Sequence, residues 1–249
     1  CAAGVDAIIS GAGLPTELPK FAEGYDVALA PIVSSTKSAN VILKFWDKKY
    51  HRTADFLVIE GPLAGGHLGF SREQLEDIPG LDYDTEIRNI ITLKQTYEEK
   101  YQTAIPVFVA GGMFTAEDVK HVLELGADGI QAATRFVATE ECDASDAYKQ
   151  AYVNASEEDV IIIKSPVGMP GRAIKNAFIQ RMLAAPDKIS HCFNCLKACN
   201  PATAPYCITQ ALINAVVGDL DNGLIFCGSR VGEIREITTV PKLMQELTV

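Results

Sequence analysis

The sequence has no long hydrophobic run and a deficit of basic residues. Its longest apolar segments, such as residues 56–59 and 160–163, are far shorter than the ~20 residues needed to cross a bilayer, and no signal pattern opens the chain. With 22 Lys and Arg against 32 Asp and Glu, the net charge is −10, which repels nucleic-acid phosphates and anionic lipid headgroups. We therefore expect neither a membrane nor a nucleic acid as a partner.

The seven cysteines are an odd number for a disulfide framework, and four of them fall close together. These four are Cys192, Cys195, Cys199 and Cys207, spaced C-x₂-C-x₃-C-x₇-C. Four thiolates at this spacing suit an iron–sulfur cluster or Zn²⁺, although reduced cysteines packed in a small subdomain would give the same pattern. The distribution indicates a reducing compartment, so we expect a cytoplasmic protein.

Continuous apolar runs rich in Val and Ile recur along the first half, each ending in small residues. They cover residues 7–10, 27–33, 56–59, 107–110 and 129–133. Apolarity without alternation is typical of strands buried on both faces. The segments therefore predict the strands of a parallel sheet.

Helical patterns separate these strands. They cover residues 17–23, 36–50, 85–101 and 115–125. The last is the best signalled, with Thr115 as N-cap, Asp118 at the capping-box position and Gly126 at the C-terminal end. Alternation of strand and helix predicts an α/β fold.

Two parallel architectures fit this alternation, an open doubly wound sheet and a closed TIM (β/α)₈ barrel. Small or functional residues follow every strand here, which favours the barrel, because an open sheet concentrates them at one switch point. Only five such strands precede residue 138, and the chain opens at Cys1. We expect the first three strands to be absent, about 80 to 100 residues at roughly 30 per βα unit.

The pattern changes in the second half. A strand at residues 160–163 and a Gly/Pro-rich turn at 165–171 precede a predicted helix at 172–183. Further helices are predicted at 208–217 and from about Val240. We expect residues 1–185 to form the barrel portion and 186–249 a cysteine-rich helical C-terminal extension.

The most informative motif begins at Glu60, directly after a predicted strand, and reads EGPLAGGHLG. Glycines such as Gly65 and Gly66 let the backbone approach a flat or anionic ligand closely. His67 can exchange protons near neutral pH. A solvated or structural histidine is the alternative, but glycines on both sides at a strand end favour a functional one.

A second motif pairs two successive strand ends. Gly111 and Gly112 follow one strand, and Ala133 and Thr134 follow the next. Backbone N–H groups from two successive loops late in a barrel hold phosphate in many enzymes, and Thr134 would add a hydroxyl. Small residues also serve to make tight turns, so the spacing of the pair supports a phosphate site more than either loop alone.

Six runs in series resemble the nitronate monooxygenase (2-nitropropane dioxygenase) family, which includes the FMN-dependent enoyl-acyl-carrier-protein reductases. The runs are residues 10–15, 60–69, 109–113, 126–131, 133–136 and 172–176. Two departures stand out: the family's first strand, with its Gly-Gly-Met run, is not in this chain, and Ala133 replaces a usual glycine.

The resemblance implies an FMN barrel whose flavin phosphate lies on the loops after the last two strands. The cofactor-binding residues it implies are Gly13, Glu60, Gly65, Gly66, Gly111, Gly112, Ala133 and Thr134. His67 would be the catalytic residue, near the reactive face of the flavin ring. The loops after Gly13 and Ser34 would border the flavin or a small-molecule substrate.

Three functions follow from this resemblance. As a nitronate monooxygenase, the protein would oxidise a nitronate or nitroalkane, with His67 removing the α-proton or orienting the anion. As an enoyl-thioester reductase, it would use NAD(P)H as substrate. As a flavin-binding subunit or fragment of a larger assembly, it would have no activity of its own. The sequence leaves open whether the chain forms a homo-oligomer.

Overall fold

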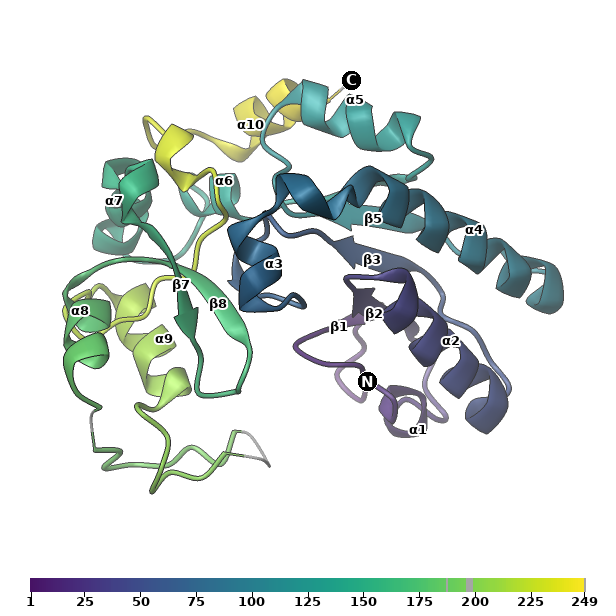
Figure 1. Ribbon diagram of the computed structural model, residues 1–249, viewed down its shortest axis with the longest axis horizontal. Helices are drawn as coiled ribbons and strands as arrows, with labels where there is room; N and C mark the ends of the chain where they lie inside the picture. The colour runs from purple at the N-terminus through teal and green to yellow at the C-terminus, as the bar shows by residue number, and fades with distance from the viewer. Residues whose placement is uncertain (187, 196–198, 249) are drawn as a thin grey trace. The chain divides into compact units, whose positions relative to one another are not determined.

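The computed structural model describes residues 1–186, 188–195 and 199–248 (Figure 1). The chain divides into two compact units. Unit 1 comprises Cys1–Pro62 and Gly69–Gln131, and unit 2 comprises Leu63–Leu68 and Ala132–Thr248.

Unit 1 is built on a five-stranded parallel sheet. Its strands are β1 (Ala7–Ser10), β2 (Ala28–Val33), β3 (Leu57–Glu60), β5 (Val107–Ala110) and β6 (Gly129–Gln131), in the order β1-β2-β3-β5-β6. All five predicted strands are confirmed. The spatial order follows the chain without reversal, as in a barrel wall and unlike the doubly wound sheet. The α/β fold is confirmed, while closure into an eight-stranded barrel stays a prediction.

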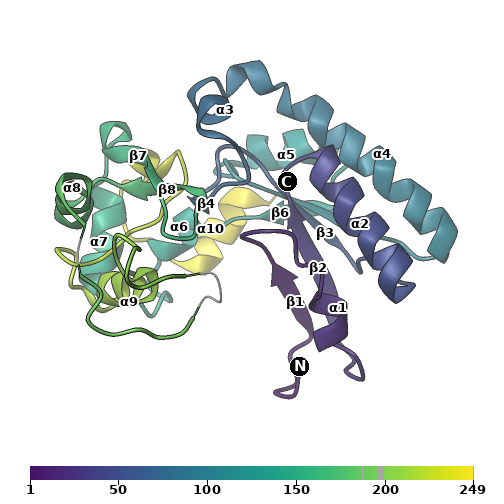
Figure 2. The ribbon, with the colours of Figure 1, turned by 60° about the horizontal axis from the view of Figure 1, so that its bottom comes forward.

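The helices of unit 1 alternate with these strands. They are α1 (Leu18–Phe21), α2 (Thr36–Tyr50), α3 (Arg72–Glu76), α4 (Tyr83–Tyr101) and α5 (Ala116–Glu124), with a 3₁₀ turn at Pro79–Leu81. The predicted capping box of α5 is present, because the Thr115 side chain accepts from Asp118 N–H and the Asp118 carboxylate accepts from Thr115 N–H. Figures 1 and 2 show α2 and α4 side by side along the sheet.

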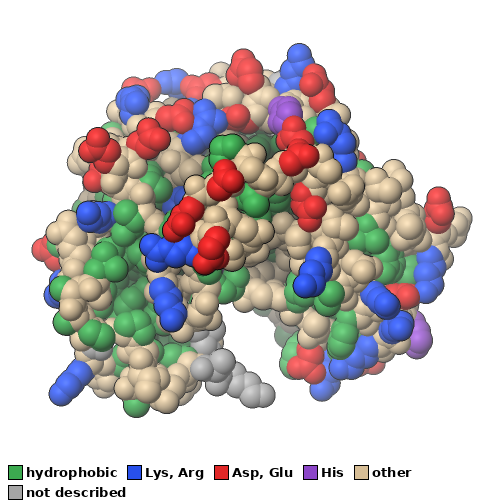
Figure 3. Space-filling model, in the orientation of Figure 1, with side chains coloured by type: hydrophobic (Ala, Val, Ile, Leu, Met, Phe, Trp, Pro, Cys, Tyr) green, Lys and Arg blue, Asp and Glu red, His purple; other side chains and the backbone are tan. Residues whose placement is uncertain are grey.

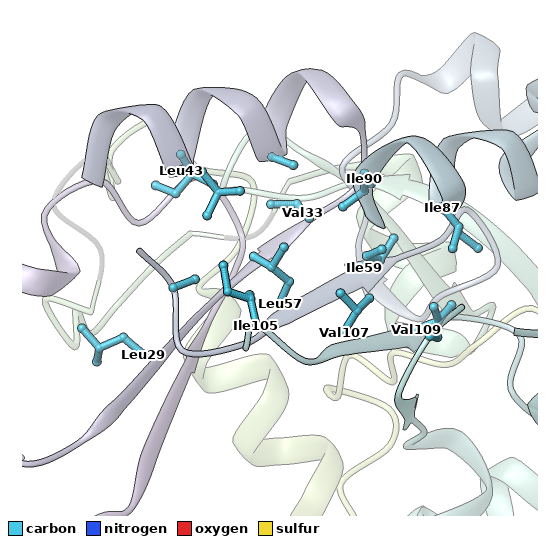
Figure 4. Packing of buried hydrophobic residues seen from close by; sticks show 14 of the residues in the cluster. Leu29, Val33, Leu43, Leu57, Ile59, Ile87, Ile90, Ile105, Val107 and Val109 are labelled. Atoms are coloured by element: carbon cyan, nitrogen blue, oxygen red, sulfur yellow. The ribbon is translucent and has the colours of Figure 1, made fainter. Parts of the chain in front are cut away.

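The core of unit 1 lies between the sheet and these two helices. Leu43 of α2 and Ile87 and Ile90 of α4 point toward the strands (Figure 4). The facing strand residues are Leu29, Val33, Leu57, Ile59, Val107 and Val109. The strands are apolar throughout, and this packing removes their apolar side chains from water. It thereby holds the ends of the strands in place.

Unit 2 has a small antiparallel sheet. Its strand order is β4 (Gly66–His67), β8 (Pro170–Ile174), β7 (Val160–Lys164). Its helices are α6 (Thr134–Val137), α7 (Asp146–Asn154), α8 (Ala177–Ala184), α9 (Ile208–Val217) and α10 (Val240–Leu247), with 3₁₀ turns at Glu157–Asp159 and Val231–Glu233. Its core includes Ile163, Phe178, Ile179, Tyr206 and Leu224.

One expectation for the second half differs from the structure. The helix predicted at 172–183 was wrong in its first part, because residues Pro170–Ile174 pair with β7 as a strand. Helix α8 begins only after Asn176, whose side chain caps it by accepting from Ile179 N–H at 3.1 Å. The compact units divide after Gln131, and the β7–β8 hairpin and α8 share a core with Tyr206 and α9. The domain boundary expected at residue 185 stays a prediction.

The surface carries charges of both signs. Acidic and basic side chains are interspersed on the face drawn in Figure 3. Among the residues that the structure describes, no helix is both long and apolar enough to cross a membrane.

Candidate functional site

The carboxyl edge of the parallel sheet in unit 1 carries four of the predicted cofactor-binding residues. Because β1, β3 and β5 belong to one parallel sheet, the residues that follow them lie along the same edge. Gly13 (φ 124°), Gly111 (φ 91°) and Gly112 (φ 84°) all adopt the left-handed conformation there. Residues with a side chain rarely adopt this conformation, so these three positions along the edge favour glycine.

Glu60 lies at the end of β3 and is largely buried. Loss of hydration raises the pKa of its carboxyl to about 7. The Tyr83 hydroxyl donates to the Glu60 carbonyl oxygen at 2.9 Å, and the Ser34 carbonyl oxygen lies 3.3 Å from the same hydroxyl. Tyr83 therefore ties the ends of β2 and β3 together, a role that no local signal in the sequence indicated.

His67 lies on β4 in unit 2, opposite Gly171 of β8. Its Nε2 is 2.7 Å from the Ser165 hydroxyl, and its ring meets Phe226 edge-on with centroids 5.1 Å apart. Partial burial lowers the pKa of His67, which favours the neutral imidazole. Nδ1 has no hydrogen-bond partner among the described residues.

The glycine-rich loop before His67 is packed closely against residues 227–229. A Cβ on Gly65 would lie 2.5 Å from the Cys227 carbonyl carbon, which only a glycine avoids. Gly66 adopts a positive φ of 70°. Gly228 N–H donates to the Thr134 hydroxyl at 2.9 Å. This bond joins the start of α6, with Ala133 just before it, to residues 227–229. The Thr134 hydroxyl accepts in this bond, so its own proton can still be donated to an anion.

Arg172 braces the same loop. Its side chain is 4% exposed, and its guanidinium donates to the Ala64 carbonyl oxygen. The sequence had placed Arg172 on a helix, whereas it lies on β8, where Cys227 N–H donates to its carbonyl oxygen at 3.2 Å. Its role is to hold the backbone that carries Gly65, Gly66 and His67.

The structure thus groups the predicted site residues in two sets. Unit 1 holds Gly13, Glu60, Gly111 and Gly112, and unit 2 holds Gly65, Gly66, His67, Ala133 and Thr134. Sequence reasoning missed Tyr83, Ser165 and Phe226. Only Ser165 carried a signal, because it opens the Gly/Pro-rich turn.

The four clustered cysteines are free thiols. Cys192 and Cys195 are exposed, and Cys199 and Cys207 are partly exposed. Within the described ranges, no three His, Cys, Asp or Glu side chains are grouped so as to hold a metal ion. Binding of an iron–sulfur cluster or zinc stays a prediction, which metal analysis of the purified protein decides.

Comparison with known families gives one match over the full length. The family described as nitronate monooxygenase matches residues 1–249. A probable nitronate monooxygenase of Staphylococcus saprophyticus is 32% identical over 135 residues, covering 54% of this chain and 36% of that protein. A probable nitronate monooxygenase of Staphylococcus aureus is 30% identical over 128 residues, covering 51% of this chain and 34% of that protein. The alignments span about a third of these curated relatives.

Two solved structures share the fold over 98% of this chain. FabK from Thermotoga maritima superposes with a TM-score of 0.70 at 25% identity, and 67% of its chain is covered. Nitroalkane oxidase from Streptomyces ansochromogenes superposes with a TM-score of 0.66 at 22% identity, and 63% of its chain is covered.

Proposed function

Because the chain belongs to the nitronate monooxygenase family, we propose that it is an FMN-dependent oxidoreductase that oxidises nitronates or nitroalkanes. The observation that supports this most is the row of left-handed glycines at the carboxyl edge of the parallel sheet, where α/β enzymes bind their ligands. A side chain at any of these positions would be strained, so the conformation favours a ligand held by backbone.

The residues present fit the phosphate and ring of FMN. In unit 1, amides near Gly111 and Gly112 would bind phosphate oxygens. Gly13 has no atom within 4 Å of where a Cβ would be, which leaves room beside the end of β1 for a flat ring. When bound, FMN supplies the two-electron chemistry that no side chain can perform.

His67 would handle the substrate proton. A neutral imidazole whose Nδ1 has no partner among the residues that the structure describes can accept a proton from the α-carbon of a nitroalkane. With the proton on Nδ1, the same atom can donate to an oxygen of an anionic nitronate. Ser165 and Phe226 keep the ring in one orientation for either role.

Reduction of an enoyl thioester by NAD(P)H is the second candidate. It is the activity of the enoyl reductases within the family that the sequence resembles. FabK overlaps 98% of the chain, and nitroalkane oxidase overlaps the same share, so this candidate stands beside the first. In this reaction His67 would deliver a proton to the α-carbon.

Assays of the FMN-loaded protein separate these candidates. Oxygen consumption with propionate nitronate supports the first, and crotonyl-thioester-dependent NADH oxidation supports the second. His67→Gln should lower kcat about 10²-fold or more in the correct assay, because general acid–base groups contribute at least that much. A third outcome would indicate a non-catalytic subunit. In it, the chain binds flavin but catalyses neither reaction, and His67→Gln leaves the activity of a larger assembly unchanged.

A further inference from the structure

Ser165 occupies a fixed position at the end of β7. Its N–H donates to the Met169 carbonyl oxygen at 3.0 Å, and its carbonyl oxygen accepts from Gly168 N–H at 2.9 Å. The residue is 2% exposed. Both backbone bonds close the turn that joins β7 to β8, so the hydroxyl has little freedom to move away from His67.

The hydrogen bonds of this hydroxyl leave two arrangements open. Val167 N–H approaches Oγ at 3.4 Å and occupies one acceptor position. In one arrangement Ser165 donates its proton to His67 Nε2, and the imidazole proton is on Nδ1. In the other, Nε2–H donates to Ser165 Oγ, and the hydroxyl proton needs a different acceptor. The two arrangements differ by the movement of protons alone.

A cavity beside Ser165 can supply that acceptor. It has a volume of about 540 Å³ and is lined by Ser165 together with Ile163, Ile179, Met182, Asn200 and Thr203, among others. Each water takes up about 30 Å³ in the liquid, so the cavity has room for several. The polar side chains of Asn200 and Thr203 can hold water there, and one such molecule could accept from the Ser165 hydroxyl.

The surroundings of His67 disfavour a charged imidazole. The charged side chain on the neighbouring strand is Arg172, a cation bonded to the Ala64 carbonyl oxygen. Next along the chain from Phe226 is Cys227, whose thiol is neutral at pH 7 because burial raises its pKa to about 12. Lys164, beside Ser165, is exposed. Since no anion among these groups would stabilise an imidazolium, loss of a proton from Nε2 as one arrives at Nδ1 would keep the ring neutral.

We propose that Ser165 relays protons between His67 Nε2 and water in the adjoining cavity, which lets Nδ1 accept or deliver a proton while the ring stays neutral. This inference rests on the proposed role of His67. In the accepting direction, the α-C–H bond of the substrate breaks and its electron pair stays on the substrate as the nitronate. The proton binds Nδ1, Nε2–H passes to Ser165 Oγ, and the hydroxyl proton passes to water. Proton delivery to a substrate is the reverse sequence.

Three variants test the relay in turnover of the FMN-loaded protein. Ser165→Ala should lower kcat about 10²-fold, a typical contribution of a proton-transfer group, with KM changed less than about threefold because Nδ1 is retained. Ser165→Thr keeps the hydroxyl and should restore most of kcat. Added imidazole, small enough for the cavity, should raise the rate of Ser165→Ala with concentration and leave wild type unchanged. A purely structural role would give no imidazole rescue, and that result would overturn the proposal.

The exit through the cavity is tested separately. Ala204 lines the cavity, and Ala204→Phe should fill part of it and lower kcat about tenfold if water there accepts the proton. The exposed Ala202 lies in the same loop and does not line the cavity, so Ala202→Phe is the matched control. Equal rates for wild type and Ala204→Phe would show that the proton does not leave by this route.

Nuclear magnetic resonance of ¹⁵N-histidine-labelled protein tests the relay without turnover. The chain has four histidines, so the signal of His67 is assigned by its loss in His67→Gln. We expect a neutral ring at pH 7 that exchanges between both tautomers, with a ratio that changes in Ser165→Ala. An unchanged ratio in folded Ser165→Ala contradicts the relay. A charged ring in wild type contradicts it even if Ser165→Ala folds poorly. Absence of flavin binding and turnover would count against the proposed function and leave this spectroscopic result standing.

Discussion

Gly65 lies so close to Cys227 that a Cβ at position 65 would be 2.5 Å from the carbonyl carbon of Cys227. The neighbouring atoms are backbone, which cannot rotate away. Gly65→Ala should therefore destabilise unit 2 by about 3 kcal/mol, the upper range for overpacking. Urea unfolding followed by circular dichroism measures this loss.

Gly168→Ala is the matched control for Gly65→Ala. Gly168 also belongs to unit 2 and has no atom within 4 Å of where its Cβ would be. Its φ of +87° makes an alanine cost about 1 kcal/mol through backbone strain alone. Equal destabilisation by the two variants would show that the close approach of Gly65 to residue 227 is not what requires glycine.

Removing the Tyr83 hydroxyl should loosen the ends of β2 and β3. Tyr83→Phe leaves the Glu60 carbonyl oxygen without this donor, at a cost of about 1–2 kcal/mol. The single tryptophan, Trp46, is fully buried in unit 1, so its fluorescence during urea unfolding reports on this unit. Tyr25→Phe, at a residue 49% exposed in the same unit, should change stability by less than about 0.5 kcal/mol.

The buried carboxyl of Glu60 should make unit 1 less stable as pH rises. Because its pKa is raised from 4.5 to about 7 in the folded state, its favourable contribution is complete below pH 4.5 and is lost as pH rises through 7. Over this window wild type should lose on the order of 3 kcal/mol relative to Glu60→Gln. Trp46 fluorescence at several pH values measures the difference, with exposed Glu23→Gln as control. Parallel pH profiles for wild type and Glu60→Gln would refute the assignment.

The glycines after β5 should contribute more to binding of the FMN phosphate than to binding of the flavin ring. Gly112→Ala strains a backbone at φ 84° and should weaken FMN binding about tenfold or more, while riboflavin, which lacks the phosphate, should be affected less. Gly126→Ala is a control with a similar strain, because Gly126 (φ 104°) follows α5 and precedes β6. If Gly126→Ala weakens FMN binding equally, the effect is one of stability and not of phosphate contact.

The parallel sheet could be predicted because its strands carry their own signal. A strand buried on both faces must be apolar throughout, and β3 and β5 show this directly in the sequence. The bounds of α2 were also predicted correctly, since Ser35 caps its start and the buried face repeats with the helical period. Strand β8 was missed because residues 170–174 include Pro, Gly and Arg, and its burial depends on β7, β4 and Phe226.

The site was predictable only where function imposes a local pattern. Gly65, Gly66 and His67 lie in one motif, so the sequence itself shows their association. Ser165 lies 98 residues from His67, and Phe226 lies in a further segment that is distant from both in the chain. Their contacts arise from packing between distant parts of the chain, which a single sequence does not encode in any short pattern.

Titration of the purified chain with FMN, followed by flavin fluorescence, tests the central claim most directly. We expect saturable binding of one FMN per chain, and weaker binding of riboflavin, because backbone amides near Gly111 and Gly112 would hold the phosphate. Absence of any change in flavin fluorescence, or riboflavin binding as tight as that of FMN, would contradict it.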